Sequence, residues 1–398
     1  MKTTAEEIIM FRKLKLTACL TVGLAMAAFP TAVSADEIII GTATGQTGGL
    51  APYDGPAMQG FQIAVDEINA AGGIGGKHKI KLISRDTRSD AAQTSIVAQD
   101  LIDSGISVLV TPSDADPSFA AAALATDAKI PAFSPAASSP TLPMMGGDYM
   151  FANFPGDNVQ ATVSAEWAHK QGLKNAYVLY SPDTQYTTLP LYFSDVFKKL
   201  GNTVAGEGTY TIGQQDFSAE VTKIKAMNPP VDVVMTAAYE PDFPAFIRQL
   251  RAAGVTAQVI GSDGIDSPTT FSLGEAAEGL VFSTAGHATP GSALEGFNKK
   301  FAAKYGKETD TIFSAIGYDL MKVIEAGVLA ADSIEPQAIR DAVANLENVN
   351  GVTSMITYKG TTGMPVRQVT LIRVKDGGRE LVAQPSPTAD LVPAPRMQ

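Results

Sequence analysis

Two kinds of segment alternate along residues 37–155. Short, continuous apolar runs, typical of strands buried on both faces, occur at 38–43, 80–84, 108–110 and 131–133. Between these runs, apolar residues such as Phe61, Ala64, Val65 and Ile68 recur at helical spacing. Helices are therefore expected at 60–71, 91–104 and 117–128. Strands that alternate with helices predict a parallel sheet covered on both faces.

A second series of the same kind follows Pro155. Its strands are expected at 176–180, 204–210, 231–236 and 258–260. Its helices are expected at 159–171, 191–200, 217–227 and 243–253. The two series predict an α/β chain with two doubly wound parallel-sheet lobes.

The last hundred or so residues do not continue the alternation. Helices near 293–305, 313–331 and 336–346 precede strand-like runs at 352–358 and 365–375. This order suggests segments that return to lobes already formed. We assign 36–156 and about 287–362 to an N-terminal lobe, and 157–286 and about 363–384 to a C-terminal lobe. The proline-rich segment 385–398 is expected to be disordered.

Residues 1–35 have the pattern of a cleaved secretory signal peptide. Arg12, Lys13 and Lys15 precede an apolar core at 16–29, and Val33-Ser34-Ala35 resembles a cleavage site. The core is too short to cross a bilayer, so we expect export to the periplasm. Met10 is an alternative start to Met1.

Composition narrows the class of protein. The formal net charge of −11 argues against binding to nucleic acid or to an anionic membrane surface. The single cysteine lies in the signal segment, so the exported chain has no disulfide or thiol chemistry. After that segment no apolar run approaches about 18 residues, so the exported protein is expected to be soluble.

The sequence offers little to support catalysis. His78, His169 and His287 are isolated from other metal-ligating residues, and no zinc-binding spacing occurs. The glycine-rich run 71–78 follows a helix and precedes a strand, which is the reverse of a phosphate loop. No Gly-x-Ser-x-Gly nucleophile motif is present. We therefore expect no enzymatic activity, no metal and no cofactor.

Polar and aromatic residues follow the predicted strands, where open parallel sheets bind ligands. In the sequence FSPAASSP at 133–140, Ala136 would let a ligand approach backbone N–H groups and Ser138 would add a hydroxyl, which suits a carboxylate. Asp263, in the second series, suits an ammonium group. The aromatic candidates that could close over the ligand are Tyr53, Tyr186 and Tyr239. The polar candidates that follow the third predicted strand are Ser113, Asp114 and Asp116.

Several of these residues could instead have a purely structural role. Asp116 followed by Pro117 is typical of a helix N-cap, and Ser138 could cap a turn before Pro140. Asp263-Gly264 is by itself a turn signal. Whether Asp114 and Asp116 face a cleft is left open by the sequence.

Longer stretches of the chain resemble a known family. The segments 39–43, 55–74, 134–138, 250–254 and 277–279, together with Tyr239, are similar to leucine/isoleucine/valine-binding proteins of ABC transporters, a group of type I periplasmic binding proteins. The resemblance implies two lobes joined by three crossovers, with a ligand held between them. It implies that Ala136 and Ser138 hold an amino acid's carboxylate, that Asp263 holds its ammonium, and that Tyr53, Tyr186 and Tyr239 surround it.

The chain departs from this family at several positions. Asp263 stands where aliphatic amino-acid binders usually have glutamate, and Asp114 and Asp116 occupy a loop that is mainly serine and threonine in those proteins. An extra carboxylate near a carboxylate subsite is repulsive unless it points away or the ligand carries a second positive group. Tyr186-Thr187-Thr188 lacks the usual glycine. The ligand therefore remains open among aliphatic, polar and basic amino acids, aromatic acids and amides.

The expected function is that of an extracytoplasmic solute-binding protein of an ABC importer. Its partners would be a small amino acid or related carboxylate and the permease and ATPase subunits, and we expect a monomer. Two alternatives are a ligand-sensing module of the same fold and a secreted α/β hydrolase.

Overall fold

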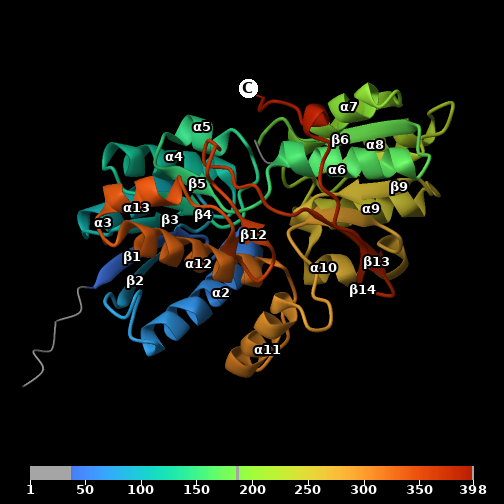
Figure 1. Ribbon diagram of the computed structural model, residues 1–398. Coiled ribbons are helices and arrows are strands. Elements are labelled where there is room, and N and C mark those ends of the chain that lie inside the picture. Colours follow the sequence, from blue (N-terminus) through green and yellow to red (C-terminus); the bar gives the residue numbers. More distant parts are fainter. Residues whose placement is uncertain (1–36, 185–187, 397–398) are drawn as a thin grey trace, which may run out of the picture. The chain divides into compact units, whose positions relative to one another are not determined.

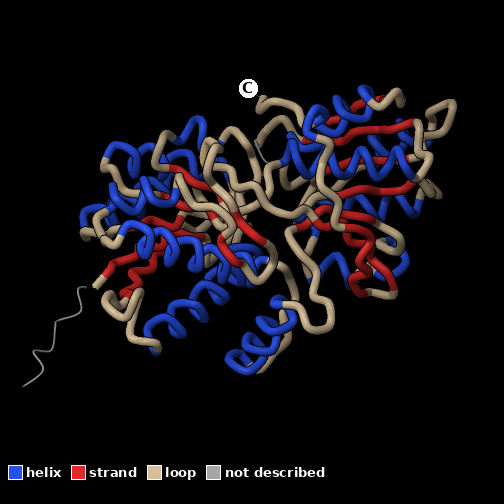
Figure 2. Tube along the Cα trace, viewed as in Figure 1, coloured by secondary structure: helices blue, strands red, loops and turns tan. Residues whose placement is uncertain are grey.

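The computed structural model describes residues 37–184 and 188–396. The expected signal peptide and the candidate Tyr186 lie outside these residues. The chain from Asp36 onward forms one compact unit. Its strands form two larger sheets, which appear as two separate groups of red segments in Figure 2.

The first sheet contains five strands in the order β2-β1-β3-β4-β5, all parallel. These strands are β1 (Ile38–Thr44), β2 (Ile80–Asp86), β3 (Val108–Val110), β4 (Ala132–Ser134) and β5 (Met150–Ala152). The helices that connect them are α2 (Ala51–Ala70), α3 (Ala91–Asp103), α4 (Ala115–Asp127) and α5 (Leu142–Gly146). One face of the sheet packs in a core with α2, and the other face packs with α3 and α4.

The second sheet has the order β14-β13-β10-β9-β8-β6-β7. Its parallel strands are β6 (Asn175–Tyr180), β7 (Thr203–Thr209), β8 (Val233–Thr236), β9 (Gln258–Gly261) and β10 (Val281–Thr284). Its longer helices are α6 (Asp157–Lys170), α7 (Leu189–Lys199), α8 (Ser218–Lys225) and α9 (Asp242–Ala252), and the short α10 (Pro268–Phe271) follows β9. The predicted α/β fold with two doubly wound parallel sheets is confirmed.

The C-terminal part of the chain returns to both sheets (Figure 1). It contains α11 (Ala293–Tyr305), α12 (Phe313–Ala331) and α13 (Pro336–Val343), the small strands β11 (Val349–Asn350) and β12 (Met355–Ile356), and the antiparallel strands β13 (Thr370–Lys375) and β14 (Gly378–Ala383). The chain thus passes between the two sheets at 153–156, 285–292 and 357–369. We call these stretches the first, second and third crossing segments. The division into lobes that we assigned from the sequence stays a prediction.

The strand-like runs at 352–358 and 365–375 were only partly correct. The first contains just the two-residue strand β12, and the second becomes a strand only from Thr370. Tyr358, at the end of the first run, and Arg367, in the second, direct their side chains into buried polar contacts instead of belonging to a named strand. β14 was not anticipated, because its Arg379 and Glu380 interrupt the apolar pattern at the edge of the second sheet.

Helices α2 and α12 approach each other unusually closely. A Cβ atom added at Gly60 would lie 1.6 Å from the carbonyl oxygen of Ser314, and one added at Gly317 would lie 1.7 Å from that of Ala57. Backbone therefore contacts backbone here, and only glycine fits at either position. This contact fixes the position of α12 against the first sheet.

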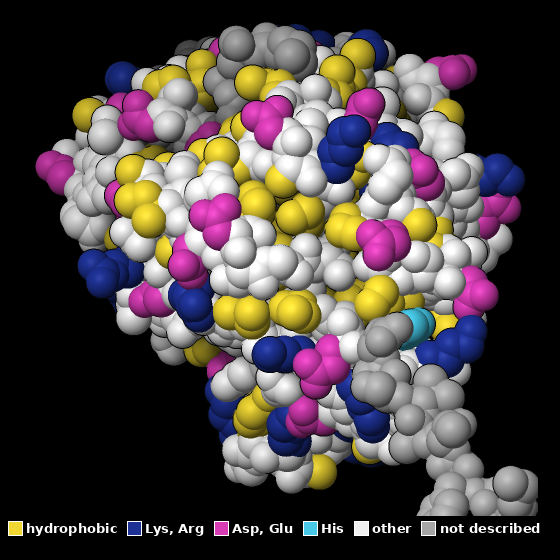
Figure 3. All heavy atoms as spheres, turned by 90° about the vertical axis from the view of Figure 1, so that its left-hand side faces the viewer, with side chains coloured by type: hydrophobic (Ala, Val, Ile, Leu, Met, Phe, Trp, Pro, Cys, Tyr) yellow, Lys and Arg dark blue, Asp and Glu magenta, His cyan; other side chains and the backbone are white. Residues whose placement is uncertain are grey.

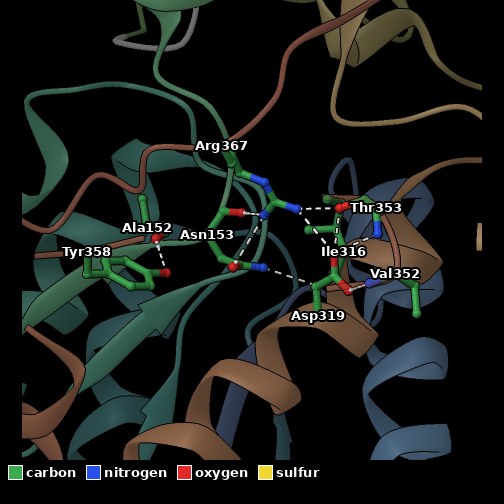
Figure 4. A network of polar contacts seen from close by, with 8 residues as sticks. All are labelled: Ala152, Asn153, Ile316, Asp319, Val352, Thr353, Tyr358 and Arg367. Carbon is green, nitrogen blue, oxygen red and sulfur yellow. Dashed lines mark hydrogen bonds and ion pairs between the residues drawn. The ribbon is translucent and has the colours of Figure 1, made fainter. Parts of the chain in front are cut away.

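A buried network joins two of the crossing segments to α12 (Figure 4). The Arg367 guanidinium forms an ion pair with Asp319 at 3.1 Å, and both side chains are fully buried. Arg367 also donates to the Asn153 carbonyl in the first crossing segment and to the Thr353 hydroxyl. Asp319 accepts from the backbone N–H groups of Val352 and Thr353 at 2.5 and 3.2 Å. The third crossing segment is thereby fixed to the first.

The C-terminal segment, which we expected to be disordered, contacts helices α6 and α7. The structure describes it as far as Arg396, whose backbone N–H donates to the Tyr192 hydroxyl of α7 at 2.7 Å. Asn158 at the start of α6 donates to the carbonyl of Pro393 at 2.8 Å, and Arg396 pairs with Asp195. Prolines leave few N–H groups to satisfy, so a few side-chain contacts can hold this segment on the helices.

The surface on the side of the first sheet carries charges of both signs. In Figure 3, Lys and Arg side chains are interspersed with Asp and Glu side chains, and no large basic area is visible on this face. In the part of the chain that the structure describes, no helix is both long and apolar enough to cross a membrane.

Replacement of Gly60 by alanine should destabilise the protein by roughly 2–3 kcal/mol, because the new methyl group must push α2 and α12 apart. Gly296→Ala, in α11, is the matched control, since its Cβ would meet no atom within 4 Å. Urea denaturation measures both effects. Equal stability of Gly60→Ala and the wild type would contradict the close approach.

Arg367→Met should destabilise the protein by about 3–5 kcal/mol, because it leaves the Asp319 carboxylate buried without its partner. The control is Arg373→Met in β13, which removes a half-exposed pair with Glu380 and should change stability by less than about 1 kcal/mol. A double variant in which Asp319→Leu accompanies Arg367→Met should recover part of the loss, as chemical denaturation can measure.

Candidate functional site

A small pocket lies where the carboxyl ends of strands from both sheets meet. The first sheet contributes loops after β1, β3 and β4, and the second contributes loops after β8 and β9. The residues that line the pocket are Leu50, Tyr53, Ser113, Asp114, Ala136, Tyr239, Asp263, Gly264 and Phe313. Its volume is about 20 Å³, which is room for about one water molecule. A larger solute can enter only when these loops separate.

Tyr53 extends from the first turn of α2 to the second sheet. Its hydroxyl donates to the carbonyl of Gly264 at 3.0 Å and accepts from the backbone N–H of Glu240 at 3.3 Å. Its ring makes edge-to-face contacts with Tyr239 and Phe313, with ring centroids 6.2 and 5.3 Å apart. Burial raises the pKa of Tyr53 well above its usual value, so the hydroxyl stays neutral at physiological pH.

Asp54, the next residue in α2, organises two of the pocket loops. Its carboxylate accepts from the backbone N–H of Gly45 at 2.6 Å and from that of Ser113 at 2.7 Å. The loop that follows β1 is therefore held against the loop that follows β3. Burial raises the pKa of Asp54 to about 6, although these hydrogen bonds oppose the shift.

Asp114 is the N-cap of α4, and its carboxylate accepts from the backbone N–H of Asp116 at 3.0 Å. The interpretation of Asp116-Pro117 as the cap was therefore wrong, because the helix begins two residues earlier, at Ala115. The capping residue itself lines the pocket. Burial, followed by the charge of Asp116, raises the pKa of Asp114 to about 7.

The stretch FSPAASSP forms a buried loop after β4. The Ser134 hydroxyl donates to the carbonyl of Pro112 at 2.6 Å and accepts from the backbone N–H of Ala137 at 3.1 Å, which fixes the loop against its neighbour. Ala136 lines the pocket, whereas Ser138 is fully buried and is not among the lining residues. The carbonyl of Ser138 accepts from the backbone N–H of Asp157 at 2.8 Å.

Asp263 begins a short 3₁₀ turn after β9 and faces the pocket from the second sheet. Its side chain is almost fully buried, and its Oδ1 atom has no hydrogen-bond partner. Burial raises the pKa of Asp263 to about 7, and the nearby Gln160 partly opposes this shift. A buried carboxyl oxygen without a donor is unfavourable unless something else supplies one.

Asp157, at the first turn of α6, was not a sequence candidate. It is completely buried, and neither of its carboxyl oxygens makes a hydrogen bond. Burial raises its pKa well above the usual value, and the charges of Asp263 and Asp114 increase it further. Its acidic side chain at a helix N-terminus is unremarkable in sequence, so no local signal distinguishes it.

The structure brings most of the predicted residues together. Tyr53, Ser113, Asp114, Ala136, Tyr239 and Asp263 all line one pocket. Asp116 is not among the lining residues, and its carboxylate accepts from the Thr184 hydroxyl. Phe313 and Leu50 were missed, because apolar residues at the start of a helix carry no signal of a binding site. In the described residues, no group of His, Cys, Asp or Glu could hold a metal ion.

Asp114→Asn should make the protein more stable at pH 8 than the wild type by roughly 3 kcal/mol, because an asparagine can still cap α4 without a buried charge. The raised pKa of Asp114 means that its protonated form stabilises the fold below about pH 4, and that this contribution is lost as pH rises toward 7. Denaturation at pH 5 and pH 8 checks this. Asp127→Asn, on the exposed side of α4, is the control, and the same loss of stability between pH 5 and 8 in Asp114→Asn and the wild type would contradict the assignment.

Known proteins are similar to this chain along most of its length. The Leu/Ile/Val-binding protein BraC3 of Rhizobium johnstonii is 28% identical over 368 residues, which cover 91% of this chain and 97% of BraC3. The crystal structure of a leucine binding protein, LivK, from Thermotoga maritima superposes with a TM-score of 0.79 at 26% identity, and covers 88% of this chain and 99% of its own.

A second solved structure is the branched-chain amino acid transporter substrate binding protein LivJ from Streptococcus pneumoniae, in complex with isoleucine. It has a TM-score of 0.79 and 26% identity, and covers 88% of this chain and all of its own. The sequence profile of the periplasmic binding protein family matches residues 37–379. The resemblance seen in the sequence is thus confirmed, and the chain belongs to the periplasmic binding protein family, among relatives named as Leu/Ile/Val-binding proteins.

Proposed function

We propose that this protein is the extracytoplasmic solute-binding protein of an ABC importer. It binds an amino acid or a related small carboxylate in the pocket between the two sheets and delivers it to a membrane permease and its ATPase. The observation that carries this proposal is that residues from the strand ends of both sheets converge on one pocket. Relatives that are named as Leu/Ile/Val-binding proteins support it.

The residues around the pocket suggest how such a ligand would be held. Ala136 leaves room for a carboxylate to reach backbone N–H groups, and Ser138 supplies a hydroxyl close by. Asp263 faces the pocket from the opposite sheet and would accept from an ammonium group. Tyr53 and Tyr239 would cover the body of the ligand, and Tyr186, outside the described residues, is expected to join them.

Binding would require the two sheets to separate and close again. A pocket of about 20 Å³ excludes any amino acid, so the ligand enters an open arrangement and is enclosed when the loops meet. The three crossing segments are the places where such a motion can occur. The closed form with its ligand would be the form that the permease recognises.

The proposal also includes a location. Relatives of this family are periplasmic binding proteins, and we infer that residues 1–35 direct export and are removed. We expect the exported protein to act as a monomer without a cofactor or catalytic activity.

A thermal-shift screen tests the proposed function. At least one L-amino acid should raise the melting temperature of the purified protein, because a ligand that binds only the folded state stabilises it. Mass spectrometry of the ligand released from denatured protein provides an independent identification. No stabilisation by any amino acid, carboxylate or amine, and no released ligand, would contradict the proposal.

Asp263→Ala should weaken ligands that carry an ammonium group by roughly ten- to a hundredfold, the usual value of a hydrogen bond to a charged group. Simple carboxylates such as benzoate should be much less affected. Calorimetric titration measures both, with the exposed Asp127→Ala as the control variant. An equal loss for both kinds of ligand would exclude the role of Asp263.

A further inference from the structure

Carboxyl groups dominate the charge around the pocket. Asp114 enters from the first sheet and Asp263 from the second, and both line the pocket. No lysine, arginine or histidine is among the lining residues. Asp157 adds a third carboxyl group beside Ser138, close enough to Asp263 and Asp114 for their charges to act on it.

Asp114 accepts from the backbone N–H of Asp116, but other carboxyl oxygens of this group are not satisfied by the protein itself. The Oδ1 atom of Asp263 and both side-chain oxygens of Asp157 are buried and make no hydrogen bond. The buried Oε1 atom of Glu240, next to the pocket residue Tyr239, also has no partner. Burying acceptors without donors is costly, and the cost is repaid when a bound group supplies the missing donors.

Neither a metal nor an internal cation accounts for this cluster. Within residues 37–184 and 188–396, no set of acidic side chains has an arrangement that could hold a metal ion. The buried guanidinium of Arg367 is paired with Asp319. The remaining candidate for compensating the negative charge is the ligand.

The net charge of the ligand decides how well it compensates the negative charge of Asp114, Asp157 and Asp263. A zwitterion with an aliphatic side chain brings one ammonium and one carboxylate, so its net charge is zero. Its carboxylate, placed at Ala136 and Ser138, would also lie near Asp157, whose carboxyl group must stay protonated while that carboxylate is bound. A second cationic nitrogen would give the pocket-lining Asp114 a counter-charge and favour its ionised form.

We propose that the natural ligand carries two cationic nitrogen groups, one bound by Asp263 and the other by Asp114. This inference rests on the proposed function and names its substrate class. A basic amino acid and a diamine share this chemistry and differ only in the carboxylate.

The aromatic residues of the pocket fit the same ligand. Tyr53, Tyr239 and Phe313 surround the space between the two aspartates, and Tyr239 lies close enough to Asp114 for that carboxylate to act on its hydroxyl. Aromatic faces attract cationic nitrogens and also cover the methylene groups between them. The pocket thus offers acidic groups at its two sides and aromatic rings between them.

The test is a calorimetric titration of the exported chain, unfolded and refolded to remove any bound solute. The probes are L-lysine, 1,5-diaminopentane, L-leucine and benzoate. L-lysine or 1,5-diaminopentane should bind at least tenfold more tightly than L-leucine, and benzoate should bind most weakly. If L-lysine binds more tightly than 1,5-diaminopentane, the pocket accommodates a carboxylate. If the diamine binds more tightly, Asp157 excludes the carboxylate. Either result supports two cationic subsites.

A variant separates the second subsite from the first. Asp114→Asn keeps the helix cap and should weaken the better two-amine ligand at least tenfold, while L-leucine changes less than threefold. Asp127→Asn, exposed on the same helix, should leave all four affinities unchanged. Circular dichroism before and after heating confirms that each variant is folded.

Two outcomes would overturn this inference. If L-leucine or benzoate binds most tightly, the two cationic subsites are excluded while the proposed function stands. If the two-amine ligands bind best but Asp114→Asn has no effect on them, the assignment of Asp114 is wrong. Absence of binding by all four probes, together with a failed amino-acid screen, would reject both the inference and the proposed function.

Discussion

The buried ion pair between Arg367 and Asp319 is the interaction on which the arrangement of the two sheets depends. It sits where the first and third crossing segments run past α12, and it binds both of them to the first sheet. Because this ion pair is buried away from water, each hydrogen bond that it loses leaves a buried polar atom without a partner. The pair therefore tolerates little change in its geometry. The first and third crossing segments are thus fixed at Asn153 and Arg367. Any motion between the sheets must take place in the parts of these segments that lie between these residues and the second sheet.

The same ion pair helps to position part of the pocket. Asp319 lies in α12, and the first residue of that helix, Phe313, lines the pocket and contacts Tyr53. The glycines that let α12 approach α2 hold both of these aromatic residues in place. The walls of the pocket are therefore rigid where they are apolar, and the acidic groups are carried by loops that are tied to this frame.

Much of the fold could be predicted from the sequence, because buried parallel strands leave continuous apolar runs and the helices between them leave a periodic pattern. The convergence of Ser113, Ala136 and Asp263 on one pocket could also be predicted, since all three follow predicted strands, and their role in binding stays a prediction. Asp157 and Phe313 could not be found in this way. Phe313 lines the pocket and Asp157 contacts the loop that contains Ser138, in both cases through contacts between segments far apart in the chain, and neither residue differs locally from an ordinary helix start. Whether Asp114 faces a cleft was left open by the sequence, and its capping role could not be predicted because it depends on where α4 begins.

The hydrogen bond from the Tyr53 hydroxyl to the Gly264 carbonyl joins the two sides of the pocket directly. Under the proposed function, this bond gives the enclosed arrangement some stability that does not depend on a solute. A transporter that responded to enclosure alone would then turn over without cargo. Under the proposed function, discrimination against such idle cycles comes from the additional free energy that the solute contributes, and the unsatisfied oxygens of Asp157 and Asp263 increase that difference when a solute supplies their missing donors.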